Sequence, residues 1–379
     1  MSMKNTKRKL LIVGSFAFLR DDLESRPIFG GLETATKILF ESDLSKDFEI
    51  IPLDSSGVSP PPRVMVRAYH AIGRILTFIK VLRRDRPDAI LILAIGFRLS
   101  ALEKGIMTWY SSLLNIPALI FPRAGGLMET LPKSLIYFKV IRFLFSKAAV
   151  FLCQGPKWEQ YAINEFKFDR KKIKIINNWT ATEELLSIGK TREYNSFESP
   201  YKLLFVGWLD EEKGIFELLQ ACNNLIKDDI NINLTIAGDG SATKPVKEFI
   251  KQNNLSNHIN VLGWVRRDRL ERLYRESHIF SLPSYSEGLP NTMIEAMSTG
   301  LPSVVTSVGL IPGIIENNKH ALIVPPRDID SLEIALRKLI DDHRYRRNIA
   351  INGHKHSLKN FSTKTSMHQL SKSINEIIF

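Results

Sequence analysis

Uninterrupted apolar runs that alternate with longer segments of helical period constrain the fold of this chain more than any other feature of its sequence. Strands buried on both faces read as continuous apolar runs, whereas half-exposed strands alternate polar and apolar residues. In the first half, six such runs occupy residues 10–13, 49–53, 89–94, 118–121, 150–153 and 173–176. Helical segments lie between them, for example at residues 32–40, 64–84 and 135–146. The first half is therefore expected to form a parallel sheet covered by helices on both faces.

The alternation stops at residues 183–200, where polar residues replace the helical period, and then restarts. Six further apolar runs follow: KLLFVG, INLTIAG, INVLG, HIFSLP, PSVVT and HALIVP. Helical segments among them occupy residues 214–227, 246–252, 268–277, 291–298 and 331–341. A length of 379 residues also suits two domains better than one core. We therefore expect an α/β chain of two Rossmann-like, doubly wound domains.

The polar segment places the expected N-terminal domain at residues 1–185 and the C-terminal domain at residues 200–359. A separate helix within residues 360–379 is expected to pack back on the first domain. Open α/β sheets bind ligands at the carboxyl ends of their strands. We therefore expect both sheets to face one interdomain cleft that holds the site.

The net charge of +12 is concentrated in the first half of the chain. Residues 1–200 hold 30 Lys and Arg against 20 Asp and Glu, whereas residues 201–379 hold 22 against 20. The basic half suits an anionic membrane surface, a phosphate-bearing acceptor or nucleic acid, and solubilising surface charge explains it equally well. Because no nucleic-acid-binding signature is present and aromatic residues are sparse in the basic stretches, we expect no nucleic acid partner.

Cysteine usage and apolar run lengths bear on the compartment. Cys153 and Cys222 are far apart and lack metal-ligand spacing, which predicts buried thiols in a reducing compartment. The first apolar run follows four basic residues and resembles a short signal peptide, but no small-residue cleavage site follows it, so we expect a buried strand there. No run reaches the roughly 18 apolar residues that span a bilayer. The expected location is cytoplasmic, at the inner face of the membrane.

The densest candidate site is PSYSEGLPNTMIEA, residues 283–296. Proline at position 290 marks the start of a helix, so Glu287 lies in the loop before it and Glu295 about one turn inside it. Four backbone N–H groups without intrahelical partners at the positive end of this helix suit a phosphate. They belong to Gly288, Leu289, Asn291 and Thr292. The two carboxylates, about 8–12 Å apart by helix rise, are expected to bind opposite ends of one extended ligand.

This segment resembles the E-x7-E signature of the retaining glycosyltransferases of family 4, which have the GT-B fold, and the similarity continues over most of the chain. The resemblance implies that Glu287 contacts a hydroxyl of the donor sugar and that Glu295 binds the ribose hydroxyls. It also implies a front-face reaction with retained configuration, in which the leaving phosphate helps to take the acceptor proton. We nominate no general base.

A second motif, FVGWLDEEKG at residues 205–214, follows the first strand of the second half. In the family this loop carries an Arg and a Lys that hold the diphosphate. Gly207 and Lys213 match the pattern, which implies that Lys213 binds the diphosphate, but Trp208 stands where the Arg is expected. Either another cation takes over, or the donor binds more weakly or in another shape. Trp208 either stacks on the donor or packs against the protein.

Further glycine and cationic positions match the family's loops. Gly30 and Gly31 resemble its glycine-rich first loop and imply close backbone approach to donor or acceptor. Arg123 matches a cationic position beside phosphates or acceptor. Gly238 and Val265 resemble positions around the nucleobase, where the backbone near Val265 would recognise the base edge.

Residues 328–330 match a D-x-D metal motif by letters alone. Asp330 instead precedes a helical run and is expected to be its N-cap, with Glu333 at the capping-box position. We expect no cofactor and transfer without a metal ion, because a helix dipole and cations can take up the charge of the leaving diphosphate.

Together these patterns predict a glycosyltransferase that uses a UDP- or GDP-linked sugar and a glycan or lipid-linked acceptor in cell-surface polysaccharide biosynthesis. Three alternatives remain open: a sugar-nucleotide epimerase, a phosphorylase of the same fold, and a non-catalytic nucleotide-binding partner subunit. The missing Arg at position 208 is the one hint of the last.

Overall fold

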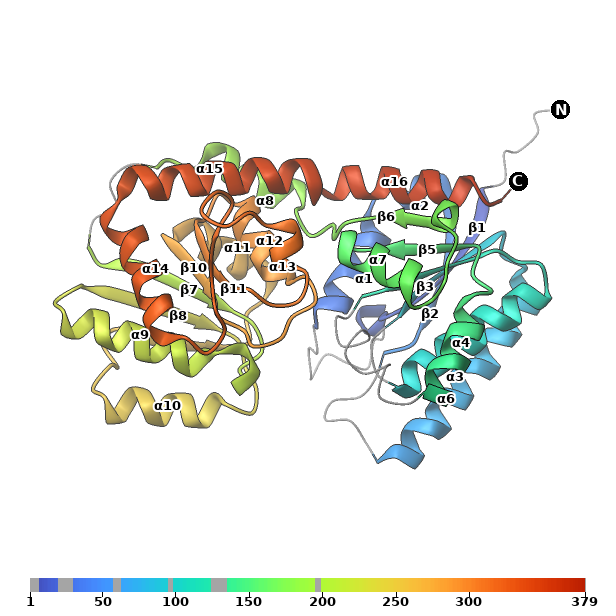
Figure 1. Cartoon of the computed structure of the whole chain (residues 1–379), viewed down its shortest axis with the longest axis horizontal. Helices are drawn as coiled ribbons and strands as arrows, with labels where there is room; N and C mark the ends of the chain where they lie inside the picture. Colours follow the sequence, from blue (N-terminus) through green and yellow to red (C-terminus); the bar gives the residue numbers. More distant parts are fainter. Residues whose placement is uncertain are drawn as a thin grey trace. The chain divides into compact units, whose positions relative to one another are not determined.

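The computed structural model describes residues 7–19, 30–56, 63–94, 98–123, 135–194 and 199–378. It divides the chain into two compact units, drawn in Figure 1. The N-terminal unit comprises residues 1–180 and 363–379, and the C-terminal unit comprises residues 181–362. The N-terminal unit thus ends at residue 180 rather than at residue 185, and the last helix of the chain belongs to it.

Every apolar run of the first half forms a strand of one parallel six-stranded sheet, as predicted. The strands are β1 (Arg8–Gly14), β2 (Phe48–Asp54), β3 (Ala89–Ala94), β4 (Ala118–Pro122), β5 (Val150–Cys153) and β6 (Ile173–Ile175). Their order across the sheet is β2-β1-β3-β4-β5-β6. β1 pairs with β2 and β3 and is fully buried from its third residue on, so the first apolar run is an inner strand.

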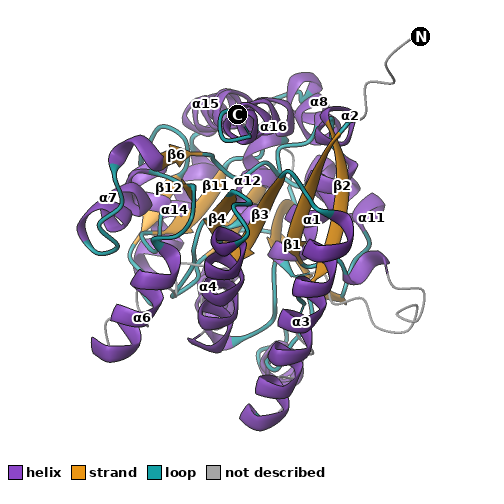
Figure 2. Ribbon diagram, turned by 90° about the vertical axis from the view of Figure 1, so that its right-hand side faces the viewer, coloured by secondary structure: helices purple, strands orange, loops and turns teal. Residues whose placement is uncertain are grey.

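Helices cover both faces of this sheet because alternate strand residues feed two separate cores. On one face the core joins Leu10 and Ile12 to α1 (Gly31–Glu41), α2 (Leu44–Asp47) and α16 (Thr363–Asn375). On the other face Leu11 and Val13 pack with α3 (Val64–Asp85) and α4 (Arg98–Leu113). α6 (Leu135–Phe145) lies along α4, and α7 (Pro156–Asn164) packs on β5 and β6. In Figure 2, α3, α4 and α6 run side by side.

The C-terminal unit contains a second parallel six-stranded sheet. Its strands are β7 (Tyr201–Val206), β8 (Ile232–Ala237), β9 (Ile259–Gly263), β10 (Ile279–Leu282), β11 (Ser303–Thr306) and β12 (Leu322–Val324). The order β12-β11-β10-β7-β8-β9 is that of a Rossmann fold, in which the first and fourth strands of the domain are neighbours. The chain therefore leaves β7 and β10 in opposite directions, and the loops after these two strands border the position where such sheets bind ligands.

Eight helices accompany this sheet in the described part of the C-terminal unit. They are α8 (Glu183–Thr191), α9 (Ile215–Lys227), α10 (Thr243–Gln252), α11 (Arg267–Glu276), α12 (Asn291–Ser298), α13 (Ile311–Ile314), α14 (Ile329–Asp341) and α15 (His343–Asn360). The five predicted helical segments are confirmed, with their boundaries shifted by up to three residues.

The prediction of irregular polar structure from residue 183 onward is wrong for its first part. Leu185, Leu186 and Ile188 lie buried on α8, because three apolar residues suffice for a short helix that packs on α12. Directly after α8, Arg192 donates to carbonyl groups at the ends of α11 and α12, with Nε 2.7 Å from the oxygen of Thr299. This arrangement ties the segment to the C-terminal unit.

Two further features bear on the cysteines and on membrane spans. Cys153 and Cys222 are free and buried, as predicted, and burial raises the pKa of both thiols, that of Cys222 to about 12. Among the residues that the structure describes, no helix is long and apolar enough to cross a membrane.

Candidate donor-binding site

The loops after β7 and β10 touch where the chain direction reverses in the C-terminal sheet. Gly214, between β7 and α9, has a φ of +65°, and a Cβ atom there would lie 2.0 Å from the carbonyl oxygen of Pro283. The N–H of Tyr285 donates to the carbonyl of Glu212 at 2.7 Å. Only a glycine allows this approach, so the sequence itself brings the two loops together.

Lys213 and Glu287, one from each loop, form an ion pair. Lys213 Nζ lies 2.7 Å from Glu287 Oε1, and the side chains are 23% and 12% exposed. The hydroxyl of Ser284 donates to the same oxygen at 2.8 Å. Within the described residues, both side-chain partners of Glu287 contact Oε1, which leaves Oε2 to accept from a ligand hydroxyl. The remaining N–H groups of Lys213 can bind an anion while the ion pair persists.

Helix α12 begins directly after the loop that carries Glu287, as predicted. Pro290 is its N-cap and Asn291 its first residue, and the side chain of Pro290 makes no capping hydrogen bond. The carbonyl of Gly288 accepts from Leu310, which holds the loop against the turn before α13. Leu289 is buried, whereas Asn291 and Thr292 are half-buried at the start of the helix. The positive end of the α12 dipole thus lies beside the ion pair, a suitable place for phosphate oxygens.

Glu295 lies one turn inside α12, but it is nearly enclosed, with 3% of its side chain exposed. Its Oε1 atom is 2.9 Å from Nη1 of Arg267, and its Oε2 atom accepts from the hydroxyl of Tyr274 at 3.0 Å. Both partners come from α11. Each carboxylate oxygen can accept a second hydrogen bond. A ligand hydroxyl can therefore add to this cluster, but only where Arg267 leaves Glu295 accessible.

The sequence interpretation missed Arg267 and Tyr274. Burial, followed by the charge of Glu295, raises the pKa of Tyr274 well above its usual value, so its hydroxyl stays protonated and donates. For Arg267, burial disfavours the charged form and so lowers the pKa. The negative charge of Glu295 and its hydrogen bond outweigh burial, so the pKa of Arg267 is raised overall. Nη2 of Arg267 is buried without a hydrogen-bond partner among the described residues. An Arg at the start of a helix, 28 residues before the acid, carries no sequence signal of this contact.

The glycine positions around β7 and β8 pack closely. A Cβ atom on Gly238 would lie 1.8 Å from the carbonyl oxygen of Gly207, so the loops after β7 and β8 depend on glycine for their contact. Trp208 is 42% exposed rather than packed in the core. Val265 is half-buried in the short link between β9 and α11, next to the exposed Trp264. These positions follow β7, β8 and β9 and so lie at the carboxyl edge of the sheet. The Lys213–Glu287 ion pair lies at the same edge, where β7 and β10 are neighbours.

The candidate residues of the N-terminal unit lie at the carboxyl edge of its own sheet. Gly30 is the N-cap of α1 and Gly31 its first residue, and a Cβ atom on Gly30 would meet nothing within 4 Å. The guanidinium of Arg123 stacks 4.3 Å from the ring of Trp179, and burial lowers the pKa of Arg123 to about 9. Its Nη1 atom has no hydrogen-bond partner among the described residues. Arg123 is therefore a half-buried cation whose Nη1 atom is enclosed, rather than a fully exposed one.

The predicted cap at Asp330 is wrong. Helix α14 begins two residues earlier, and Asp328 is its N-cap, accepting from the N–H of Ser331 at 2.9 Å. Glu333 accepts from Asn224 and pairs with Arg337 instead of closing a capping box. Both Asp residues could have capped the helix, and Asp328 does so because Ser331 also donates its hydroxyl to it. No group of three or more potential metal ligands occurs in the described ranges.

A protein-family model matches the part of the chain that contains this site. Residues 189–356 match the family model described as glycosyl transferases group 1, a span that contains Lys213, Glu287, Glu295 and Arg267. The C-terminal unit therefore matches the group 1 glycosyl transferases. This match and the glycosyltransferases named among the relatives below support a transferase.

Curated relatives agree with this family at low identity. An uncharacterized glycosyltransferase of Methanocaldococcus jannaschii is 27% identical over 63% of this chain and 63% of its own length. A UDP-Gal:alpha-D-GlcNAc-diphosphoundecaprenol alpha-1,3-galactosyltransferase of Escherichia coli is 24% identical over 71% of this chain and 70% of its own length. The capsular polysaccharide biosynthesis glycosyltransferase CapM of Staphylococcus aureus is 26% identical over 69% and 71%. The aligned part of this chain thus covers about two thirds of each relative.

Solved structures share the whole fold. Sucrose-phosphate synthase from Thermosynechococcus elongatus matches with a TM-score of 0.78, at 16% identity over 98% of this chain and 99% of that one. HepE from Anabaena, solved in complex with UDP-glucose, matches with a TM-score of 0.70, at 16% identity over 97% and 99%. The two parallel sheets with flanking helices therefore form a GT-B fold, as predicted.

Proposed function

We propose that this chain is a retaining glycosyltransferase that moves a sugar from a UDP- or GDP-linked donor to a glycan or lipid-linked acceptor in cell-surface polysaccharide biosynthesis. The observation that carries the proposal is the Lys213–Glu287 ion pair at the point where the C-terminal sheet reverses its strand order, beside the start of α12. This is where Rossmann folds bind phosphorylated ligands.

The chemistry assigned to the site follows from charge. As the bond between sugar and diphosphate breaks, negative charge grows on the leaving phosphate. Lys213 and the positive end of α12 are fixed there before the reaction, so they stabilise this charge without reorganisation. Oε2 of Glu287 can accept from a donor-sugar hydroxyl and orient the sugar. We assign no metal ion and no cofactor to this reaction, because the cation and the helix supply the positive charge.

The nucleoside would lie toward α11 and β9. Glu295 would accept from the ribose hydroxyls through its remaining lone pairs, and the backbone beside Val265 would contact the base edge. Exposed Trp208 offers a ring for stacking where the family pattern has an Arg. Arg123 of the N-terminal unit is a half-buried cation whose Nη1 atom has no partner among the described residues, and we keep it as the cation expected beside phosphate or acceptor.

The names of similar proteins support the donor and acceptor classes. HepE was solved with UDP and with UDP-glucose, and the Escherichia coli relative takes a UDP-linked sugar and a diphosphoundecaprenol-linked acceptor by its name. The relatives from Erwinia amylovora and Staphylococcus aureus are named for amylovoran and capsular polysaccharide biosynthesis. A membrane-bound acceptor further suggests that the basic N-terminal half contacts an anionic membrane at its cytoplasmic face.

Binding and turnover measurements test this proposal. Thermal stability is measured with UDP, GDP and their sugar conjugates, and nucleoside diphosphate release is then measured with candidate lipid-linked acceptors, with and without a metal chelator. We expect one nucleotide class to stabilise the chain and the release to depend on acceptor. A sugar-nucleotide epimerase would change the donor without an acceptor, and a non-catalytic partner subunit would bind the nucleotide without release; either result overturns the proposal.

A further inference from the structure

Two helices of the N-terminal unit carry apolar faces that are exposed in the described part of the unit. On α3, four apolar side chains at successive turns point away from the buried residues Ala71, Phe78 and Leu82. They are Met65, Tyr69, Ile72 and Leu76, each more than half exposed, with Met65 at 85%. Such a stripe normally faces a core, because an amphipathic helix buries its apolar side. Here the solvent side of the helix is apolar as well.

Helix α6 repeats this pattern on the far side of α4. Its buried side carries Ile141, Leu144 and Phe145, and its opposite side is also apolar. The exposed residues there are Leu135, Ile136, Val140 and Phe143, with Ile136 at 79%. Since α3 and α6 both pack along α4 and run side by side with it (Figure 2), the two helices that carry these stripes lie on the same side of the sheet. We call the exposed residues of α3 and α6 the apolar helix surface. Folded monomers rarely leave so many large apolar residues exposed together.

The charges around the apolar helix surface are almost all positive. Exposed Lys80 and Arg83 follow the apolar stripe on α3, and Lys139 interrupts the stripe on α6. Just after α6, Lys147 lies 4.9 Å from the ring of Phe143. The two acids of α3 and α4 are already neutralised: Glu103 pairs with Arg74 and Lys104, and Asp85 pairs with Arg84.

We propose that the apolar helix surface binds an anionic phospholipid bilayer, with its apolar side chains between the acyl chains and its cations at the headgroups. Apolar faces flanked by Lys and Arg bind membranes in this way, and each cation near an anionic surface strengthens binding by about fivefold. A second copy of the chain is a poorer occupant, because a symmetric contact would bring the like charges of Lys80, Arg83 and Lys139 from both copies into one interface. The proposal builds on the membrane-linked glycosyltransferase proposed above and gives it a docking surface.

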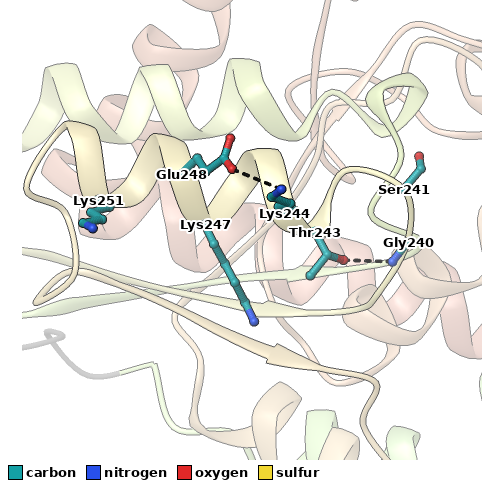
Figure 3. A pocket seen from close by; sticks show the side chains of 7 residues that line it. All are labelled: Gly240, Ser241, Thr243, Lys244, Lys247, Glu248 and Lys251. Atoms are coloured by element: carbon teal, nitrogen blue, oxygen red, sulfur yellow. Dashed lines mark hydrogen bonds and ion pairs between the residues drawn. The ribbon is translucent and has the colours of Figure 1, made fainter.

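A second basic surface of the chain serves as a comparison. Lys244, Lys247 and Lys251 line a groove along α10 in the C-terminal unit (Figure 3). The residues that line this groove with them are glycine, serine, threonine and glutamate, so the groove is basic and no large apolar residue lines it. If charge alone directed membrane binding, this groove would contribute as much as the apolar helix surface does.

Vesicle co-sedimentation of the full chain, without donor or acceptor, tests the proposal. We expect binding to phosphatidylcholine vesicles that contain phosphatidylglycerol, and weaker binding to phosphatidylcholine alone. The variant Met65→Gln/Ile72→Gln/Leu76→Gln keeps helix-forming residues at exposed positions and should lower the partition coefficient by about tenfold or more. Two controls should bind as the parent does: Ile334→Gln, at a 67% exposed position on α14, and the triple exchange of the three α10 lysines to Gln.

Four outcomes would overturn the proposal: no binding to the anionic vesicles at low salt, unchanged binding of the α3 variant, equal loss in the α10 variant, or a dimer in sedimentation that the α3 variant abolishes. The urea unfolding curve of the α3 variant is measured in parallel and should match that of the parent chain in both units, which shows that the N-terminal unit carrying α3 is folded. If vesicle binding fails while sugar transfer persists, only the docking surface is wrong. If transfer fails while vesicle binding persists, only the proposed function is wrong.

Discussion

Exchange of Lys213 for methionine isolates the charge that the proposed mechanism places on the diphosphate. Methionine keeps most of the aliphatic stem and removes the ammonium group, whose Nζ atom lies 2.7 Å from Oε1 of Glu287. Glu287 then retains the hydroxyl of Ser284 as its partner at 2.8 Å. A bound diphosphate would then lie near the Glu287 carboxylate without a compensating cation. It would lose its attraction to the Lys213 ammonium group and would also be repelled by Glu287.

The expected size of the effect follows from Coulomb's law. Two unit charges about 4 Å apart interact by about 4 kcal/mol at an effective dielectric constant of 20. Lys213 is 23% exposed and Glu287 is 12% exposed, so solvent screens part of this energy, and we retain about half of it. A loss of about 2 kcal/mol weakens nucleoside diphosphate binding by about thirtyfold. The corresponding nucleoside has no phosphate, so its affinity for Lys213→Met should fall by less than about threefold.

Calorimetric titration of the four proteins of a double-mutant cycle measures this difference. The cycle comprises the parent chain, Lys213→Met, Glu287→Gln and the double variant, each titrated with the nucleoside and the nucleoside diphosphate. Because the second exchange removes the exposed carboxylate, the double variant should regain part of the diphosphate affinity while its transfer activity stays low. Lys244→Met is the matched control, since Lys244 is 88% exposed and lies 4.0 Å from its partner Glu248.

Three results would refute the electrostatic reasoning. Equal losses of nucleoside and nucleoside diphosphate affinity in Lys213→Met would indicate a change in fold rather than a lost phosphate contact. A double variant that binds no better than Lys213→Met would show that Glu287 does not oppose the diphosphate. A comparable loss in Lys244→Met would show that total charge, rather than this ion pair, governs binding.

Three further predictions concern the same unit. Glu295→Gln should weaken the binding of nucleoside and of nucleoside diphosphate by the same factor. Arg267→Met should weaken both by a similar factor, because Arg267 and Glu295 act as a pair. Calorimetry that finds no loss of affinity in either variant would contradict this. Burial, followed by the charge of a neighbouring histidine, lowers the pKa of His356 to about 4. The contribution of His356 to the free energy of unfolding should therefore be full above pH about 6.5 and fall by about 1–2 kcal/mol toward pH 4, because the unfolded chain takes up the proton first. Urea unfolding of His356→Gln should show a flatter pH dependence than that of the parent chain. Gly238→Ala should lower the urea midpoint by an amount that corresponds to about 1–3 kcal/mol, whereas Gly313→Ala, where a Cβ atom meets nothing within 4 Å, should change it little.

The strands were predictable from sequence because burial on both faces of a parallel sheet leaves a continuous apolar run. All twelve predicted strands are present. Helix α15 was missed because it buries only a few scattered residues, among them Ile349, Ala350 and Gly353, and otherwise presents polar and basic side chains. Neither its composition nor its period separates such a helix from a polar linker. Its packing on α12 and α14, which sequence periodicity does not contain, determines its structure.

The candidate site was predictable to the extent that its parts are local. Glu287, the start of α12 and Lys213 follow from turn residues, a helix boundary and a family pattern within short segments. The contact between the loops also follows from Gly214, but only the structure shows that the glycine admits Pro283. Arg267 lies outside any such local pattern, because its contact depends on how α11 packs beside α12.

The enclosure of Glu295 has a consequence for how the donor binds. A carboxylate that loses its water costs free energy unless hydrogen bonds replace that water, and here Arg267 and Tyr274 supply one bond each. The cluster still contains an Arg267 Nη2 atom without a partner among the described residues. A ribose hydroxyl can donate to Glu295 and accept from Nη2, which would satisfy both groups at once. A deoxyribonucleotide lacks the 2′ hydroxyl and should therefore bind the parent chain less tightly than the ribonucleotide. This disadvantage should shrink in Arg267→Met, where the 2′ hydroxyl keeps only its bond to Glu295. An equal preference in both proteins would mean that the ribose does not complete this cluster.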